Sequence, residues 1–274
     1  MFKYLITLCV LLGSTLAQEN CECGISRVRE ERDTFPDATV FTKHKFPWLM
    51  RIDAKYELKN GTKGSFNCHG VLIDSKSVLT STECRPEATN EDVKEVDYKL
   101  HVGNHKIHRV SVFHRPKKVK VTDLTKNSKD HFLILKLEKD VEKVSPICIP
   151  SVKREEKSNN KREFVTAGWI HHADKDRMSH EPRMATLPFN QLKADGVLTV
   201  AFGTSYFTSM QLESFEMGQP IMYKEDGRWF LHSIFTQNMK SEYKTFNQKA
   251  ISSSLAAAVY EKAFAEVAPN TCRL

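Results

Sequence analysis

The sequence has no hydrophobic stretch long enough to span a membrane. Its most apolar segment, residues 4–12, follows Lys3 and precedes the small residues Thr15 and Ala17. A membrane-spanning helix needs about 20 apolar residues, so this segment is too short to form one. A basic start, a short apolar core and a small-residue end are instead typical of a secretory signal peptide. We therefore expect residues 1–17 to be removed and the remaining chain to be secreted and extracellular.

Features of several other protein classes are also missing. Helical periodicity is almost absent before the C-terminus, and there is no internal repeat of fixed period and no low-complexity tract. A hydrophobic content of 40% is enough for a full core and argues against global disorder. The formal net charge of +7 is modest for 274 residues and favours acidic partners without requiring them. Since no nucleic-acid-binding motif is recognisable, we expect no nucleic-acid partner.

Short runs rich in β-branched and aromatic residues make up most of the chain. Turn signals such as Asn60-Gly61 and Asp226-Gly227 separate some of these runs. Many short strands at this spacing favour β-barrels or β-sandwiches. The strands predicted in this way are residues 71–80, 98–103, 108–114, 131–137, 164–170, 197–203 and 228–236.

The pattern changes in three other places. Ser252 to Ser254 offer N-capping side chains ahead of apolar residues at helical spacing, which predicts a helix at about residues 252–267. Residues 151–163 are nearly all charged or polar and are expected to form an exposed linker between two halves. Residues 18–34 are expected to form a polar N-terminal extension.

Six cysteines remain once the signal peptide is removed. An even number in an oxidising compartment indicates disulfides, although six cysteines permit 15 pairings. The Cys21-Glu22-Cys23 spacing is one residue short of the usual zinc knuckle, so we expect no metal and no cofactor. The six are Cys21, Cys23, Cys68, Cys84, Cys148 and Cys272.

The chain contains a single Asn-x-Ser/Thr sequence, at Asn60-Gly61-Thr62. This sequence predicts an N-linked glycan on a surface loop. The alternative is an unmodified hairpin turn, because Asn-Gly is also a strong turn signal.

Several segments follow one another in an order that characterises one protein family. They are residues 46–48 (FPW), 68–73 (CHGVLI), 78–84 (VLTSTEC), 130–137 (DHFLILKL), 145–150 (SPICIP), 165–169 (VTAGW), 218–221 (GQPI) and 226–229 (DGRW). They resemble the barrel start, CGGSLI, WVLTAAHC, NDIALLKL, PICLP, VTGWG and the end of GDSGGPL, with its following strand, in the chymotrypsin/trypsin family of serine proteases (peptidase family S1). The resemblance covers roughly residues 35–266.

The resemblance implies an all-β fold in which two antiparallel β-barrels of the trypsin-like type pack together, with a C-terminal α-helix. The domain would cover residues 35–268, with barrels at about 35–150 and 164–250. In the family, the active site lies in the cleft between the barrels.

The same resemblance implies a disulfide pattern. It places a bond between Cys68 and Cys84 inside the first barrel. It also suggests that Cys148 bonds to one of the two cysteines of the extension, with Cys272 taking the other.

The catalytic positions of the family hold the wrong chemical groups. A serine protease needs a hydroxyl nucleophile, an imidazole base and a carboxylate that orients the imidazole. In an ungapped alignment the imidazole position holds Glu83, the carboxylate position His131 and the nucleophile position Met217. Phe215 stands where the oxyanion hole needs a glycine. Loss of the nucleophile or base costs about 10⁶-fold in rate, so we expect no catalysis.

An enzymatic alternative stays open at this point. A one-residue shift would restore a carboxylate at Asp130, but it supplies neither the serine nor the histidine. A rebuilt site would need His131 and Glu83 to exchange roles and Ser209 or Ser214 to act as the nucleophile.

The sequence therefore predicts a secreted, catalytically inactive serine protease homologue. It would bind an extracellular protein or glycan and could regulate or decoy active proteases. One alternative is an active but divergent trypsin-like endopeptidase. A second is a polyanion- or glycosaminoglycan-binding module that uses the basic runs at residues 115–120 and 153–162, although Glu155 and Glu156 dilute the second run.

Overall fold

The structure is a computed structural model of the whole chain. Within the described residues no helix is long and apolar enough to cross a membrane. The expected signal peptide lies outside these residues, as does most of the N-terminal extension. The described residues are 21–26, 39–41, 44–81, 84, 92–102, 113–114, 121–123, 132–137, 139–151, 154, 162–169, 171–172, 177–178, 182–187, 197–202, 217–235, 248–254, 264 and 268–274.

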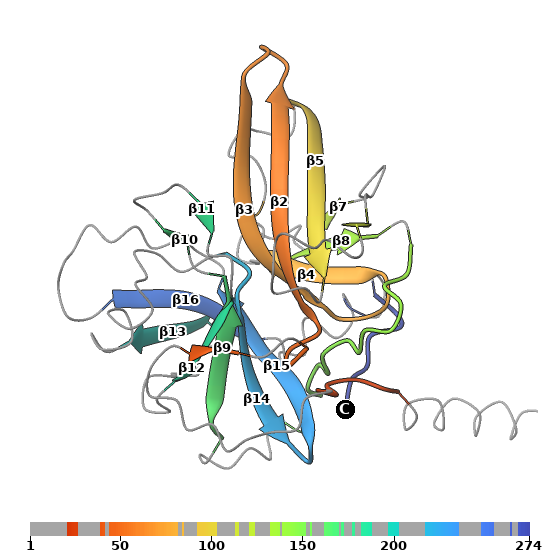
Figure 1. Cartoon of the computed structure of the whole chain (residues 1–274), viewed down its shortest axis with the longest axis vertical. Helices are drawn as coiled ribbons and strands as arrows, with labels where there is room; N and C mark the ends of the chain where they lie inside the picture. The colour runs from red at the N-terminus through yellow and green to blue at the C-terminus, as the bar shows by residue number, and fades with distance from the viewer. Residues whose placement is uncertain are drawn as a thin grey trace, which may run out of the picture.

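Two seven-stranded antiparallel sheets form the body of the protein (Figure 1). The first has the order β6-β5-β2-β3-β4-β8-β7 and the second the order β1-β12-β9-β14-β15-β16-β13, while β10 and β11 pair separately. The strands are β1 (Thr39–Val40), β2 (Leu49–Leu58), β3 (Lys63–Leu72), β4 (Ser77–Ser81), β5 (Val93–Val102), β6 (Phe113–His114), β7 (Val121–Asp123), β8 (Phe132–Lys136), β9 (Phe164–Gly168), β10 (His171–His172), β11 (Arg177–Met178), β12 (Arg183–Leu187), β13 (Val197–Phe202), β14 (Pro220–Glu225), β15 (Arg228–Phe235) and β16 (Gln248–Ser254).

The all-β prediction is thus confirmed in its coarse form. The first sheet lies within the first predicted half of the chain, and the second sheet is built almost entirely from the second half. The exception is β1, which pairs with β12 and so joins the first half of the chain to the second sheet. Closure of each sheet into a barrel stays a prediction, because the described pairings leave two ends on each sheet.

Strands β2, β3 and β5 extend together away from the body as a long three-stranded arm (Figure 1). Side chains in a strand alternate between two faces. On one face Ile52 lies between Cys68 and Leu100, and all three are fully buried. The opposite face carries the charged residues Arg51 and Asp53, which alternate with the buried positions of β2. Alternation therefore fixes which face of the arm meets the core.

The tip of the arm is the predicted Asn-Gly turn. Asn60 accepts a hydrogen bond from the main-chain N–H of Thr62 at 2.9 Å, and Gly61 adopts a φ of +84°. All three residues are exposed. The turn prediction is confirmed, and glycosylation of Asn60 stays a prediction at an accessible position.

The predicted strand at residues 71–80 is in fact the end of β3, a turn and β4. Asp74 makes the turn: its carboxylate accepts hydrogen bonds from the N–H of Lys76 at 2.7 Å and from the hydroxyl of Ser77 at 2.8 Å. An aspartate that bonds its own following main chain is a common way to reverse a chain. The single long strand was therefore wrong.

In the second sheet, β14 and β15 form a hairpin across the predicted Asp226-Gly227 turn. Asp226 and Gly227 both adopt positive φ, at 52° and 76°. Two consecutive residues of positive φ match the twist of a two-residue hairpin. The aromatic rings of Tyr223 and Phe230 stack across this hairpin with centroids 5.3 Å apart.

The start of the predicted C-terminal helix was wrong. Ser252 to Ser254 belong to β16, where Ser252 and Ser253 pair with β13 on one side and all three pair with β15 on the other. Strand pairing on both sides satisfies the main chain better than three serine caps would. Most of residues 255–267 lie outside the described residues. Phe264 is helical, and its carbonyl accepts a hydrogen bond from the N–H of Ala268.

Among the described positions of the predicted linker at residues 151–163, Glu163 is exposed, whereas Ser151, Arg154 and Arg162 are half-buried. Arg154 and Arg162 both bond to the carboxylate of Glu225, at 2.6 and 3.2 Å. Their guanidinium groups also lie over the rings of Phe230 and Tyr223, at 4.5 and 4.0 Å from the centroids. The prediction of a solvated linker was therefore wrong for these two arginines, which fasten the connection to the second sheet.

Candidate functional site

Of the three predicted catalytic positions, Met217 is the one that the structure describes. Glu83, His131 and Phe215 lie outside the described residues. Met217 is half-buried, packs against the hydrophobic core and stands two residues before Gln219, just ahead of β14. Met217 is therefore the described residue around which the candidate site lies.

Met217 and Gly218 form a tight turn where the two sheets meet. The N–H of His69 in β3 donates to the carbonyl of Met217 at 2.8 Å, which links the first sheet to the second. Gly218 has a φ of +81°, and a Cβ at this position would lie 2.0 Å from the carbonyl oxygen of His69. The close approach of the two main chains therefore requires glycine. We call the contact among His69, Thr80, Gly168, Trp169 and residues 217–219 the sheet junction.

A buried imidazole fills the centre of the sheet junction. His69 is fully buried, and its ring stacks on Trp169 with centroids 5.8 Å apart. The main-chain N–H of Trp169 donates to Nε2 of His69 at 2.7 Å. A Cβ on Gly168 would lie 2.6 Å from the same nitrogen, so the glycine makes room for the ring.

The environment of His69 keeps the imidazole neutral. Burial, assisted by the positive charge of Arg51, lowers the pKa of His69 to about 3. Because Nε2 accepts a hydrogen bond, the proton of the neutral ring lies on Nδ1. The lone pair that a general base would use is thus already engaged by Trp169. His69 is therefore placed as a structural hydrogen-bond acceptor and not as a general base.

The hydroxyl groups near His69 and Gln219 are also engaged. Thr80 donates through Oγ1 to the carbonyl of His69 at 2.7 Å, and Thr166 donates to the carbonyl of Pro220 at 2.8 Å. The amide of Gln219 donates to Oγ1 of Thr166 at 3.0 Å. Neither hydroxyl is paired with an imidazole nitrogen, so neither has a base that would activate it.

A second polar cluster lies on the charged face of the arm. Asp53 is bonded to Nε of Arg51 at 2.7 Å and to Nε2 of His101 at 2.9 Å. Burial raises the pKa of Asp53, but the hydrogen bond to His101 and the charge of Arg51 more than offset this, so the net pKa lies below its ordinary value. This cluster neutralises charge across neighbouring strands.

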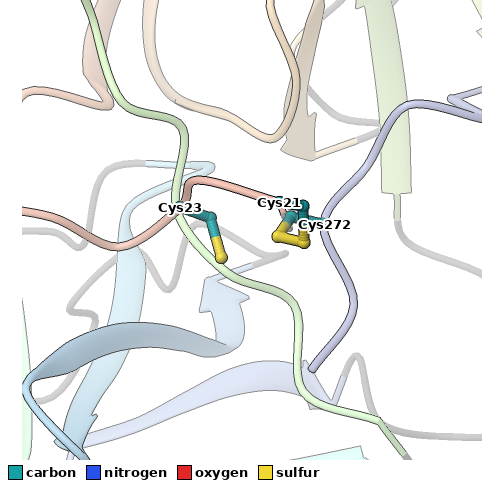
Figure 2. Close-up of side chains that lie close together, drawn as sticks. All are labelled: Cys21, Cys23 and Cys272. Carbon is teal, nitrogen blue, oxygen red and sulfur yellow. A yellow bond between two sulfur atoms is a disulfide. The ribbon is translucent and has the colours of Figure 1, made fainter. Parts of the chain in front are cut away.

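The extension, the C-terminus and the segment between the sheets are joined by disulfides. Cys21 is bonded to Cys272, and Cys23 is bonded to Cys148. The structure also contains the bond between Cys68 and Cys84 that the family resemblance implied. Figure 2 shows that Cys23 lies next to the Cys21–Cys272 bond. We call Cys21, Cys23, Cys148 and Cys272 the cysteine clamp.

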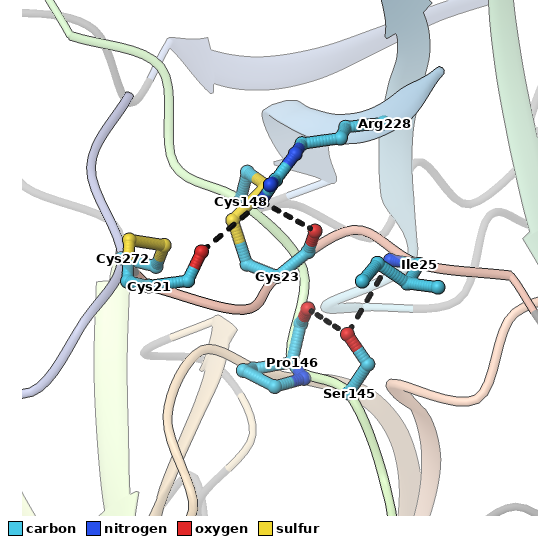
Figure 3. The surroundings of a disulfide bond; sticks show 8 residues. All are labelled: Cys21, Cys23, Ile25, Ser145, Pro146, Cys148, Arg228 and Cys272. Atoms are coloured by element: carbon cyan, nitrogen blue, oxygen red, sulfur yellow. Dashed lines mark hydrogen bonds between the residues drawn. A yellow bond between two sulfur atoms is a disulfide. The ribbon is translucent and has the colours of Figure 1, made fainter. Parts of the chain in front are cut away.

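Main-chain hydrogen bonds fit the extension closely into the clamp. Gly24 donates to the carbonyl of Pro146 at 2.7 Å and accepts from the N–H of Trp229 at 2.9 Å. It adopts a φ of +67°, and a Cβ there would lie 2.4 Å from the carbonyl oxygen of Trp229. Arg228 donates to the carbonyls of Cys21 and Cys23 at 3.1 and 3.5 Å (Figure 3). The extension is therefore held against β15 and against the segment that contains Pro146.

Sequence reasoning did not single out His69 or Arg228. A signal for His69 was present, since it is a polar residue inside the apolar run at residues 68–73 and stands at a glycine position of the resembled CGGSLI segment. Arg228 carries no comparable signal, because its two acceptors lie more than 200 positions away in the sequence.

Comparison with known proteins agrees with this architecture. The family model named Trypsin matches residues 38–196, which is more than half of the chain and ends before Met217. The venom serine protease Bi-VSP of Bombus ignitus is 27% identical over 151 residues, which cover 54% of this chain and 41% of that protein. The chain thus spans less than half the length of this relative. On the family match, with the paired antiparallel sheets and the ordered landmark segments, this chain belongs to the trypsin family of serine proteases, peptidase family S1.

Proposed function

We propose that this protein is a catalytically inactive member of the trypsin family that acts outside the cell by binding a protein or glycan partner. The observation that carries the proposal is the methionine at residue 217, which aligns with the family's nucleophile in the sequence resemblance and lies in the turn that links the two sheets. A thioether has no proton to transfer and forms no stable acyl intermediate, so the family mechanism has no first step.

The surroundings of Met217 support the same conclusion. The buried imidazole of His69 already accepts a hydrogen bond, and its low pKa leaves it a weak base. The described hydroxyls of Thr80 and Thr166 donate to main-chain carbonyls. The scaffold, by contrast, retains its sheets and three disulfides. A maintained scaffold around a replaced nucleophile favours a role that depends on shape and surface rather than on catalysis.

Secretion is part of this proposal. The disulfides suit an oxidising compartment, and the N-terminal residues have the pattern of a signal peptide. The partner would meet the protein in that compartment, where regulation or decoying of active proteases is the role we favour.

The competing function is an active, divergent serine endopeptidase, which the printed name of the bumblebee relative favours. Labelling of the purified protein with a fluorophosphonate probe separates the two. We expect no label that depends on the native fold, alongside full labelling of an active trypsin-family protease. Specific labelling that disappears on heat denaturation would overturn our proposal.

The variant Met217→Ser sharpens this experiment. It returns a hydroxyl to the turn but leaves Glu83 at the base position, so we expect it to remain unlabelled. Labelling of Met217→Ser alone would show that a working base still faces the turn. Our account of the lost machinery would then be wrong even though the natural protein is inert.

A further inference from the structure

We propose that the cysteine clamp is a thiol-responsive modification site in which a low-molecular-weight thiol becomes attached to Cys21 and the Cys23–Cys148 bond is exchanged for a Cys23–Cys272 bond. The two disulfides of the clamp would then act as one coupled unit rather than as two independent cross-links. The site lies away from Met217, so the proposal does not depend on whether the protein is an active protease.

Solvent access selects Cys21 as the point of entry. Cys21 is half-buried, whereas Cys23 and Cys148 are 0% exposed and Cys272 is 4% exposed. A thiol from solvent can attack only a sulfur that it can reach, and access is one of the factors that set the rate of exchange. The attack therefore begins at Cys21 and releases Cys272.

The short distance between the sulfur atoms then allows the second disulfide to react. The Sγ atoms of Cys21, Cys23 and Cys272 all lie within 4.8 Å of one another. Once Cys272 is a thiolate, the sulfur of Cys23 is thus its neighbour, as the close-up of the three cysteines shows (Figure 2). Disulfide isomerisation proceeds by this kind of attack of a thiolate on a neighbouring disulfide sulfur.

The charges around the clamp favour a thiolate. The guanidinium of Arg228 is bonded to the carbonyls of both Cys21 and Cys23 and so brings a positive charge to the clamp (Figure 3). Nearby arginine side chains stabilise the thiolate form of cysteine. The neighbouring carboxylate, Glu22, is exposed, where water screens its charge.

The chemistry balances without an added oxidant. The thiolate RS⁻ attacks Sγ of Cys21, the Cys21–Cys272 bond breaks, and its electron pair goes to Cys272. The Cys272 thiolate attacks Sγ of Cys23, the Cys23–Cys148 bond breaks, and its electron pair goes to Cys148, which takes up a proton. One thiol and two disulfides enter, and one thiol and two disulfides leave.

The fold can tolerate this exchange because main-chain hydrogen bonds hold the released segment. The N–H of Cys148 donates to the carbonyl of Trp229 at 3.2 Å, and its carbonyl accepts from Leu231 at 2.9 Å. The extension would stay covalently attached through Cys23 and Cys272. Exchange therefore changes the covalent links of the clamp without releasing either terminal segment.

The first test treats the purified full-length protein with reduced glutathione, traps free thiols with an alkylating reagent and maps the disulfides by mass spectrometry. We expect glutathione on Cys21, the alkyl label on Cys148 and a Cys23–Cys272 peptide pair. Label confined to Cys21 and Cys272, with Cys23–Cys148 intact throughout, would overturn the proposal.

Two variants test the coupling without any added thiol. Cys21→Ser leaves Cys272 free beside Cys23, so we expect part of the label on Cys148. Cys272→Ser is the matched control, since its free Cys21 would have to form a strained disulfide with a residue two positions away. We expect about tenfold more label on Cys148 in Cys21→Ser than in Cys272→Ser, because a Cys23–Cys272 bond closes without the strain of a Cys21–Cys23 bond.

The buried Cys68–Cys84 bond is an internal control in both variants. It should remain unlabelled, because exchange in the clamp needs no general opening of the fold. Equal labelling of Cys148 in the two variants, or labelling of Cys68 and Cys84 at the same rate, would show nonspecific opening and contradict the proposal.

Discussion

The sheet junction and the cysteine clamp both join the two halves of this protein, but they do so by different physical means. At the sheet junction two main chains approach closely around Gly218, and a neutral imidazole fills the remaining space. At the clamp, covalent bonds and main-chain hydrogen bonds tie three segments that are far apart in the sequence. The sheet junction thus depends on glycines that leave room for close main-chain contacts. The clamp depends on covalent links between distant parts of the chain. The two regions should therefore respond to different perturbations.

The largest effect is expected from Gly218→Ala, which attacks the sheet junction directly. A Cβ would clash with the carbonyl of His69 and with Oγ1 of Thr80, and alanine also disfavours the positive φ. We expect the free energy of unfolding to fall by about 5 kcal/mol, from the sum of overpacking and left-handed strain. Urea unfolding followed by tryptophan fluorescence measures this change.

Gly61→Ala is the matched control for this prediction. Gly61 also has a positive φ, but nothing lies within 4 Å of a Cβ built there. It should lose only the conformational part, about 1 kcal/mol. Equal losses in the two variants would show that backbone strain alone, and not the close approach of the sheets, requires glycine at 218.

Loss of the Cys23–Cys148 bond is expected to have the next largest effect, and it acts on the clamp. The double variant Cys23→Ala, Cys148→Ala removes a cross-link between residues 125 positions apart. The chain-entropy relation predicts a loss of about 4.9 kcal/mol for so long a loop. Thermal unfolding and urea unfolding should both report it.

The Cys68–Cys84 bond serves as the reference for that loss. Its two residues are 16 positions apart, so its removal should cost about 3 kcal/mol by the same relation. If removal of the shorter link proved more costly, local packing rather than chain topology would dominate the clamp.

Acid should lower the free energy of unfolding through His69 at the sheet junction, by less than loss of the Cys23–Cys148 bond. The pKa of His69 is about 3 in the folded protein against 6.5 for the free side chain, so the unfolded chain binds one more proton between these pH values. This contribution to stability is therefore complete above pH 6.5 and is lost as the pH falls toward 3. Between pH 7 and pH 4 we expect a loss of about 3 kcal/mol from this residue.

The variant His69→Gln tests the acid effect against the background of other groups. Glutamine can still accept the hydrogen bond from Trp169 but does not titrate. The pH dependence of urea unfolding should therefore be shallower in the variant between pH 7 and pH 4. An unchanged dependence would mean that other groups, such as Asp53, account for acid sensitivity.

The smallest effect on stability is expected at the tip of the arm, which touches neither joining region. Asn60→Gln should change the free energy of unfolding by less than about 0.5 kcal/mol, because the residue is exposed. In protein secreted from eukaryotic cells it should also abolish the mass lost on treatment with an N-glycosidase. No mass loss from the natural protein would contradict the predicted glycan.

Local chemistry made three strands of the second sheet (β9, β13 and β15) and the hairpin tips predictable. Asn60-Gly61 and Asp226-Gly227 form turns because their side chains and positive φ values suit tight reversals. In the arm, the central strand β2 and the first half of β3 were missed, since both are rich in charged and small residues. Ser252 to Ser254 were assigned to a helix because serine is a common helix N-cap. The sequence alone did not show that these serines continue a strand.

The candidate site was only partly predictable. Met217 followed from the landmark residues around it, because a turn motif is local in sequence. The buried state of His69 did not, since it depends on Gly168 and Trp169, about 100 positions away. The same holds for Arg162. Its charged segment predicted exposure, but in the structure it forms an ion pair with Glu225, 63 positions away.

The sequence by itself determined the all-β character, the main turns and the family relationship, because each is written in neighbouring residues. Tertiary structure alone decided which cysteine of the Cys21-Glu22-Cys23 pair meets Cys148, and it alone set the neutral state of His69. Both depend on distances and solvent exclusion among distant segments. Such quantities exist only after the chain has folded.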